Sequence, residues 1–173
     1  DLESITKGLM NKAFSKSKLE EMLFFQENRR DVTSLYLDNG YANLKLNFTE
    51  NYEKDSLVIV EVNIEENEQY IFGKVDFRGN IRTKDKVLHQ TVLTASGDRF
   101  SRGKIILSQN KLMQLDYFVP EAFDVDLNID TLKKEVDVTY VLKERISDRF
   151  LVSGGFDWTY LIGTLGFDFK NFE

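Results

Sequence analysis

Apolar and polar residues alternate along two blocks of the chain. The first block has apolar positions at Leu44, Leu46, Phe48, Val58, Val60, Val62 and Ile64. The second has them at Phe123, Val125, Leu127, Ile129, Val136, Val138, Tyr140 and Leu142. Because the side chains of a β-strand point alternately to its two faces, this period of two predicts a pair of strands in each block. A loop at Glu50–Asp55 joins the first pair, and polar residues between the apolar positions of the second predict a face in contact with water.

Apolar residues at helical spacing precede each pair of strands. The expected helices of the first block carry Leu19, Met22 and Leu23, then Val32, Leu35 and Tyr36. Those of the second carry Val87, Leu88, Thr91 and Val92, then Ile105, Leu112 and Leu115. The expected N-caps are Ser15, Thr83 and Ser101. Gly40 and Asp116 are expected to end the second helix of each block in the left-handed conformation.

The two blocks are imperfect copies of one unit. In the second copy, Val75 and Phe77 predict a strand before the turn Gly79-Asn80, and Asn11 of the first copy stands where the second has Asn80. Each copy therefore follows the order β-α-α-β-β over roughly 65–75 residues. The predicted fold class is α+β.

The last 25 residues differ from both copies, because they hold seven of the 22 aromatic residues and four of the ten glycines. Apolar residues or glycines recur with period two at Phe150, Val152, Gly154, Phe156, Trp158, Leu161, Gly163, Leu165, Phe167 and Phe169. Residues between them, such as Ser153, Asp157 and Thr164, are small or polar. Two strands of about ten residues with this pattern are typical of a hairpin from an outer-membrane β-barrel. A soluble hairpin packed on a core is the alternative.

Composition and charge exclude several classes of function. A net charge of −6 disfavours binding to nucleic acid. The absence of cysteine excludes disulfides and thiolate sites, and the single histidine, His89, leaves no pair of histidines for zinc. The alternating Asp124, Asp126 and Asp130 lack the glycine-containing loop of a calcium site. We therefore expect no catalytic residues, no metal and no cofactor.

Several segments, taken in order, resemble one family. They are FRGN followed by TKDKVL, then GDRFSRGKI, LDYFV, VDVTYVLKER and FLVSGGFDW. In this order they resemble BamA and its relatives, the outer-membrane barrel assembly factors with periplasmic POTRA domains. The resemblance implies a penultimate POTRA domain at 1–67 with an incomplete first strand, the last POTRA domain at 68–145, and the first hairpin of a transmembrane barrel at 146–173. Since two strands alone leave unpaired edges in lipid, it also implies further barrel strands.

The resemblance implies recognition and membrane insertion of proteins, not catalysis. Unfolded outer-membrane proteins would add to an edge strand by β-augmentation. The implied client-binding residues are Asn43, Leu44, Lys45, Leu46, Asn47 and Phe48 in the first copy and Phe123, Asp124, Val125, Asp126 and Leu127 in the second. The strand with Phe150, Val152, Gly154, Gly155, Phe156 and Trp158 would be the lateral-gate strand, because its paired glycines weaken strand pairing.

The implied location is the outer membrane of a diderm bacterium, with the POTRA domains in the periplasm. The implied partners are unfolded outer-membrane proteins, accessory assembly lipoproteins and outer-membrane lipid. A docking region for a lipoprotein would include His89, Ser96 and Gly97. Ser96 stands where some family members have an acidic residue, so we expect a different partner surface, or none.

Two other interpretations fit the same pattern. A secretion transporter or an organelle import pore of the same superfamily would share the POTRA domains and the start of a barrel. A soluble POTRA-type interaction module would share the two copies, but its tail would be an ordinary soluble hairpin.

Overall fold

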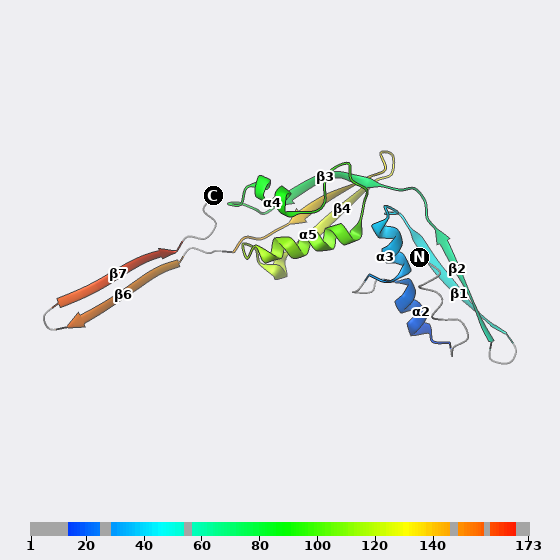
Figure 1. The fold of residues 1–173 in the computed structure, drawn as a ribbon, viewed down its shortest axis with the longest axis horizontal. Helices are drawn as coiled ribbons and strands as arrows, with labels where there is room; N and C mark the ends of the chain where they lie inside the picture. The colour runs from blue at the N-terminus through cyan, green and yellow to red at the C-terminus, as the bar shows by residue number, and fades with distance from the viewer. Residues whose placement is uncertain (1–13, 25–28, 54–56, 146–148, 158–159, 169–173) are drawn as a thin grey trace.

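The structure is a computed structural model that describes residues 14–24, 29–53, 57–145, 149–157 and 160–168. In these ranges the strands form three separate sheets, of two, three and two strands. Figure 1 shows the sheets in chain order, with helices packed beside the first two. This arrangement confirms the predicted α+β class.

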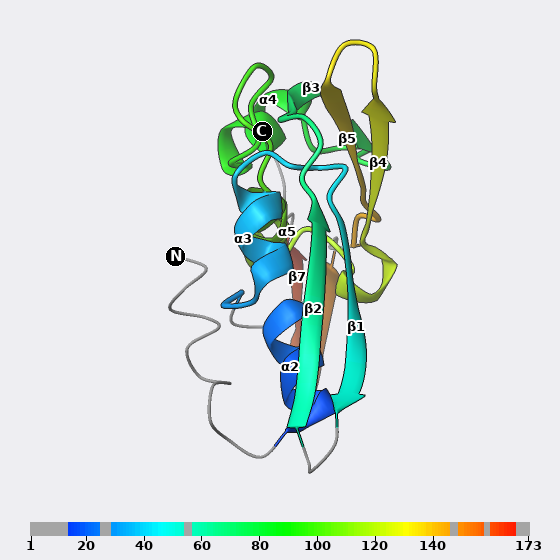
Figure 2. The same cartoon turned by 90° about the vertical axis from the view of Figure 1, so that its right-hand side faces the viewer.

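The first sheet and its two helices form one packed unit. It contains α2 (Lys16–Leu23), α3 (Val32–Asp38), β1 (Lys45–Glu53) and β2 (Leu57–Glu65). The strands pair antiparallel, and Figure 2 shows both helices on one face of the pair. The buried residues Leu19, Leu23 and Val32 pack against Leu46, Phe48, Val60 and Ile64. The apolar side chains that recur at helical spacing and those that recur at β-strand spacing therefore pack together in a single small core.

Two details of this unit differ from the sequence prediction, and a third was not predicted. β1 continues to Glu53, where it pairs with Leu57, so the predicted loop at Glu50–Asp55 began too early. Ser15 is the N-cap of α2, but its hydroxyl contacts Ser17 Oγ at 3.0 Å and makes no capping bond. The N-cap of α3 is Asp31, whose carboxylate accepts from the Ser34 N–H at 2.8 Å. A short polar side chain at that position satisfies a helical N–H that would otherwise lack a partner.

The second unit is larger and has a three-stranded sheet. It contains β3 (Ile71–Arg78), α4 (Asp85–Thr91), α5 (Arg102–Gln114), the 3-10 turn η1 (Pro120–Ala122), β4 (Asp124–Asp130) and β5 (Glu135–Val141). The strand order is β3-β5-β4, with β5 parallel to β3 and antiparallel to β4. Its core includes Phe72, Leu88, Leu112, Phe118, Val136, Val138 and Tyr140, each at most 1% exposed. The central strand therefore supplies the middle of the core.

The helix boundaries of this unit confirm one predicted cap and correct another. Ser101 caps α5, since its hydroxyl accepts from the Lys104 N–H at 3.1 Å. Thr83 is not the N-cap of α4: the helix starts one residue later, after Lys84, and the Thr83 N–H donates to Glu144. Gly40 and Asp116 have φ of +97° and +56°, which confirms their predicted left-handed conformations.

The third sheet is the hairpin of β6 (Arg149–Asp157) and β7 (Tyr160–Asp168). Its register places apolar residues or glycines opposite each other, as in Phe150↔Phe167, Val152↔Leu165 and Gly154↔Gly163. Val152 and Leu165 are 77% and 72% exposed. One face of the hairpin therefore carries large apolar side chains that no described part of the chain covers.

Among the described helices, none is long and apolar enough to cross a membrane.

Candidate functional site

One edge of the three-stranded sheet is open and the other is partly closed. On the closed side, the start of β3 bonds to the segment before α5: the Phe72 N–H donates to the Asp98 carbonyl at 2.8 Å, and the Phe72 carbonyl accepts from Gly97 at 2.8 Å. On the other side, β4 pairs with β5 alone within the described chain. β4 is therefore the edge at which another strand could be added.

The backbone of β4 also shows which groups face outward. The Val125 N–H donates to the carboxylate of its neighbour Asp124 at 2.8 Å and is therefore not used in pairing with β5. In an antiparallel strand, successive residues direct their N–H and C=O groups alternately toward and away from the partner. The N–H and C=O groups of Leu127 and Ile129 therefore point the same way as those of Val125, away from β5 and into solvent.

The side chains of β4 give the open edge two different faces. Leu127 and Ile129 lie opposite the fully buried Val138 and Val136, yet they are 48% and 43% exposed because they stand at the margin of the core. The other face carries Asp126, whose carboxylate is 3.7 Å from Arg78 Nη1. Phe123 precedes β4, and its ring centroid is 6.2 Å from that of Tyr140. An added strand would meet an apolar margin on one side and charge on the other.

The predicted client-binding residues of the first copy lie partly outside a strand. Asn43 and Leu44 precede β1, and the Asn43 carbonyl accepts from Asn67 Nδ2 at 2.8 Å. Lys45, Leu46, Asn47 and Phe48 lie in β1, which pairs only with β2 among the described strands. Leu46 and Phe48 pack on the core of the first unit. Leu46 and Phe48 are less exposed than Leu127 and Ile129 of β4.

The predicted lateral-gate residues lie on β6, except Trp158, which is outside the described residues. Gly154 faces Gly163, and a side chain built at Gly155 or Gly163 would meet no atom within 4 Å. Close packing therefore does not require glycine at position 155 or 163. They lower the contact between β6 and β7 at the middle of the hairpin.

The structure does not bring the three predicted docking residues together. His89 on α4 contacts the ring of Phe77 near the end of β3, with centroids 4.9 Å apart. Gly97 lies in a turn beside Phe72 near the start of the same strand and has φ of +86°. Five residues of a strand span about 17 Å. Ser96 and Gly97 thus lie toward the opposite end of β3 from His89.

Two carboxylates with a clear structural role were missed in the sequence. Asp38, at the end of α3, accepts from the Gly103 N–H at 2.6 Å and from the Ser101 hydroxyl at 3.0 Å, both at the start of α5. Arg29 Nη1 lies 3.7 Å from the same carboxylate. An acidic residue in the last turn of a helix interacts unfavourably with the helix dipole. This unfavourable position was the available signal in the sequence that Asp38 has a partner outside its own helix.

The second carboxylate, Glu144, holds the segment by which the chain leaves the second unit. It accepts from the N–H groups of Arg82 at 2.9 Å and Thr83 at 2.7 Å. Burial by itself would raise the pKa of Glu144, but hydrogen bonds from Thr83, Arg82 and Ile81 outweigh it and lower the pKa. The carboxylate is therefore ionised at neutral pH.

Arg145 fixes the other side of the same segment. Its Nε donates to the Phe118 carbonyl at 2.8 Å, and its Nη1 pairs with Asp116 at 2.6 Å. Backbone bonds from Val119 to Lys143 and from Arg145 to Tyr117 add to this contact. Residues 143–145 are thus held between the turn after β3 and the turn after α5.

Comparison with known proteins agrees with this architecture. The POTRA family model, described as surface antigen variable number repeat, matches residues 70–145, which contain the β3-β5-β4 sheet and its helices. The outer membrane protein assembly factor BamA of Nitratidesulfovibrio vulgaris is 25% identical over 142 residues, which are 82% of this chain and 18% of that protein. BamA of Buchnera aphidicola is 25% identical over 115 residues, 66% of this chain and 18% of the relative.

Residues 70–145 match a POTRA domain, and the chain is similar to BamA.

Solved structures show the same fold. BamA from Haemophilus ducreyi lacking POTRA domains 1–3 superposes with a TM-score of 0.68 over 90% of this chain and 30% of that one, at 19% identity. POTRA domains 3–5 of Haemophilus influenzae BamA give 0.67 over 83% of this chain and 54% of that one, at 20% identity. The chain spans about a fifth of the length of the BamA relatives that it matches in sequence. These relatives are named outer membrane protein assembly factors, in agreement with the predicted localisation.

Proposed function

We propose that this BamA-like chain is the POTRA and barrel-start part of an outer-membrane protein assembly factor, and that unfolded β-barrel clients add to β4 as an extra strand. The open edge of β4 supports this proposal most directly. Main-chain bonds give affinity without reading sequence, which suits a protein that handles many different clients. The half-exposed Leu127 and Ile129 would cover alternate apolar side chains of the client, since strands of an outer-membrane barrel have one apolar face.

The proposal assigns the parts of the chain as the sequence resemblance does. Residues 1–67 are a penultimate POTRA domain, residues 68–145 the last one, and residues 146–173 the first hairpin of the barrel. β6 would be the lateral-gate strand, since its glycines lower the contact with its neighbour. Accessory lipoproteins and outer-membrane lipid would be partners of the whole protein.

A proline in β4 tests client binding to its edge. Leu127→Pro removes the outward N–H of β4, and Leu127→Ala removes the same apolar side chain but keeps the N–H. We expect Leu127→Pro to weaken binding of a peptide from a barrel strand about tenfold beyond Leu127→Ala, by fluorescence anisotropy with the full-length protein. Circular dichroism checks that both variants fold.

A trapping experiment covers the case in which the proline variant does not fold. Since the chain contains no cysteine, Leu127→Cys and Leu132→Cys each introduce one thiol, the first on β4 and the second in the turn beyond it. A client with a single cysteine should form a disulfide with position 127 and much less with position 132. Equal trapping at the two positions, or equal peptide binding by the proline and alanine variants, contradicts the proposal.

A further inference from the structure

We propose that residues 79–84, the turn between β3 and α4, lie against the anionic headgroups of the membrane that the hairpin enters. This inference rests on the proposed function, because it requires β6 and β7 to be membrane strands. It concerns a different surface from the β4 edge, and no client or accessory protein takes part in it.

The first observation is an isoleucine fully in solvent on a turn that is held in place. Ile81 is 91% exposed, whereas the backbone on either side of it is tied down. Gly79 has φ of +92° and packs against the Leu142 carbonyl, and Asn80 Nδ2 donates to the Thr83 carbonyl at 2.9 Å. Glu144 binds the N–H groups of Arg82 and Thr83. These bonds hold the turn in the conformation that exposes Ile81, so its apolar surface is available to a partner from outside the domain.

The second observation is where this turn lies. β3 and β5 are parallel, so the turn after β3 and the exit of β5 lie at the same end of the sheet. Glu144, which holds the turn, is five residues before Arg149, the first residue of β6. Five residues of fully extended chain span at most about 18 Å. Glu144 therefore stays within that distance of the start of β6, and the turn lies beyond it by no more than the length of the Glu144 side chain and its hydrogen bonds.

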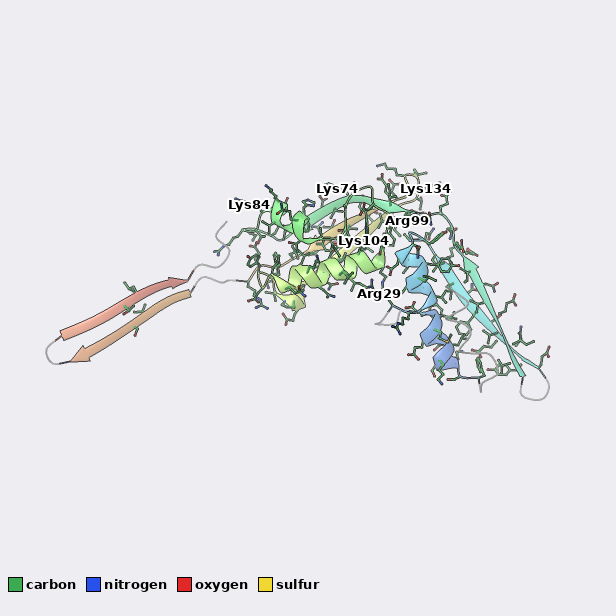
Figure 3. The ribbon with its side chains drawn as sticks, viewed as in Figure 1. Arg29, Lys74, Lys84, Arg99, Lys104 and Lys134 are labelled. Carbon is green, nitrogen blue, oxygen red and sulfur yellow. The ribbon has the colours of Figure 1, made fainter. Side chains whose placement is uncertain are left out.

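The third observation is the charge around Ile81. Arg82, Lys84 and Lys86 follow within five positions, and all three are exposed. Two acidic groups lie beside them: Asp85 accepts from Asn80 Nδ2 at 2.6 Å, and Glu144 binds the N–H groups of the turn. Figure 3 shows Lys84 at the end of the domain from which the chain continues to β6. Within the described part of the chain, neither Lys84 nor Lys86 has an ion-pair partner. An apolar side chain flanked by basic ones matches a bilayer interface with anionic lipid, where the cations contact phosphate and the apolar group enters the acyl boundary.

The opposite end of the same sheet provides an internal control. Leu132, in the turn between β4 and β5, is 93% exposed and is followed by Lys133 and Lys134. These two lysines pair with Asp130 at 3.7 Å and Glu68 at 2.6 Å, so acidic partners offset their charge. Figure 3 shows Lys134 at the end of the domain away from Lys84. An exposed apolar residue thus occurs at both ends, but only one end combines it with unpaired lysines and the chain exit.

Site-specific fluorescence tests the inference. Ile81→Cys, Leu132→Cys and Val152→Cys are labelled with an environment-sensitive dye in the full-length protein, reconstituted in vesicles that contain phosphatidylglycerol and a lipid-borne quencher. We expect the dye at position 81 to shift to shorter wavelength and to be quenched, as at position 152 on the apolar face of β6. The dye at position 132 should show neither effect. Replacing Lys84 and Lys86 with glutamine should lower the quenching at position 81 and leave position 152 unchanged.

The three positions separate the possible failures. Quenching at 152 with no difference between 81 and 132 overturns the inference and leaves membrane entry of the hairpin intact. No quenching at 152 contradicts the proposed function itself. A blue shift at 81 without lipid quenching shows that protein, not lipid, covers the turn, and this also overturns the inference.

Discussion

At the scale of single residues, Glu144 links two segments of the second unit that are 61–62 residues apart in the sequence. It stands just after β5, and its carboxylate binds N–H groups of the turn after β3. Hydrogen bonds to an ionised carboxylate are stronger than those between neutral groups, and leaving their donors without a partner adds a further cost. The contact therefore contributes more than a typical surface bond.

Replacing Glu144 with glutamine should lower stability in a way that depends on pH. The pKa of Glu144 is lowered in the folded state, so its ionised form favours folding. This contribution is complete above the pKa of glutamate in the unfolded chain and is lost as pH falls through the lower, folded value. At pH 7 we expect Glu144→Gln to reduce the free energy of unfolding by about 1–2 kcal/mol, measured by urea denaturation.

The pH series distinguishes this contact from a general effect of charge. The difference between wild type and Glu144→Gln should shrink as the pH is lowered below about 4. The exposed Glu121 serves as control, since it lies in the same unit and Glu121→Gln should leave the free energy of unfolding nearly unchanged. A Glu144→Gln difference that is constant between pH 7 and pH 3 contradicts the role of the carboxylate.

Tyr140 shows how the core accommodates one polar atom. Its side chain is fully buried at the centre of the sheet, and its hydroxyl lies 3.0 Å from Thr94 Oγ1. Burial raises the pKa of Tyr140, and hydrogen bonds with Ser108 and Thr94 offset part of that rise. We expect Tyr140→Phe to cost about 1 kcal/mol through the lost hydrogen bond and Tyr140→Ala about 3–5 kcal/mol through the cavity. Equal costs for the two variants, by chemical denaturation, would show that the ring does not fill the core.

At the scale of elements, the start of α5 is capped by two different parts of the chain. Ser101, next to the helix, binds the N–H of Lys104, and Asp38, at the end of α3, binds the N–H of Gly103. The backbone continues the contact, since the Tyr70 N–H donates to the Gly40 carbonyl at 2.8 Å. The cap therefore also joins the first unit to the second.

Removing Asp38 should loosen the junction between the two units. We expect Asp38→Ala to reduce stability by about 1 kcal/mol, as for the loss of an N-cap, and to speed amide hydrogen exchange at Gly103 and Tyr70. Ser101→Ala should cost a similar amount but speed exchange at Tyr70 less, because it removes one of the two bonds to Asp38 and keeps the bond from the Gly103 N–H. Glu61→Ala, an exposed change on β2, is the control. If Asp38→Ala leaves exchange at both amides unchanged, the carboxylate does not join the units.

The elements themselves could be predicted from the sequence better than the contacts between them. Val136, Val138 and Tyr140 alternate with polar residues and form the central buried strand, because burial of one face imposes a period of two. Thr83 has the residue type of an N-cap, yet α4 begins after Lys84, and the Thr83 N–H binds Glu144, 61 residues later in the chain. Asp38 and Glu144 were missed for the same reason: their partners are distant in sequence, and local propensity carries no information about them. The β4 edge was predicted by family resemblance, since strand order does not follow from periodicity.

At the scale of the whole molecule, the described core is divided. The cluster around Leu112 contains 13 buried apolar residues, and the cluster around Leu19 contains three. Burial of apolar surface is the main force that favours folding, so the two units should differ in stability. The stability of the first unit therefore depends strongly on each of the three buried residues in the small cluster.

The same substitution in each of the two clusters should therefore destabilise different strands. Leu19 and Leu112 are 2% and 0% exposed, and truncation of a buried leucine to alanine costs about 2–5 kcal/mol. We expect Leu19→Ala to speed hydrogen exchange throughout β1 and β2 while β3 and β5 keep their protection. Leu112→Ala should weaken protection in β3 and β5, and also in α3, because α3 is joined to the start of α5 through Asp38. Loss of protection in all strands to the same extent in both variants would show that the two units unfold as one, and the separate cores would then have no separate stability.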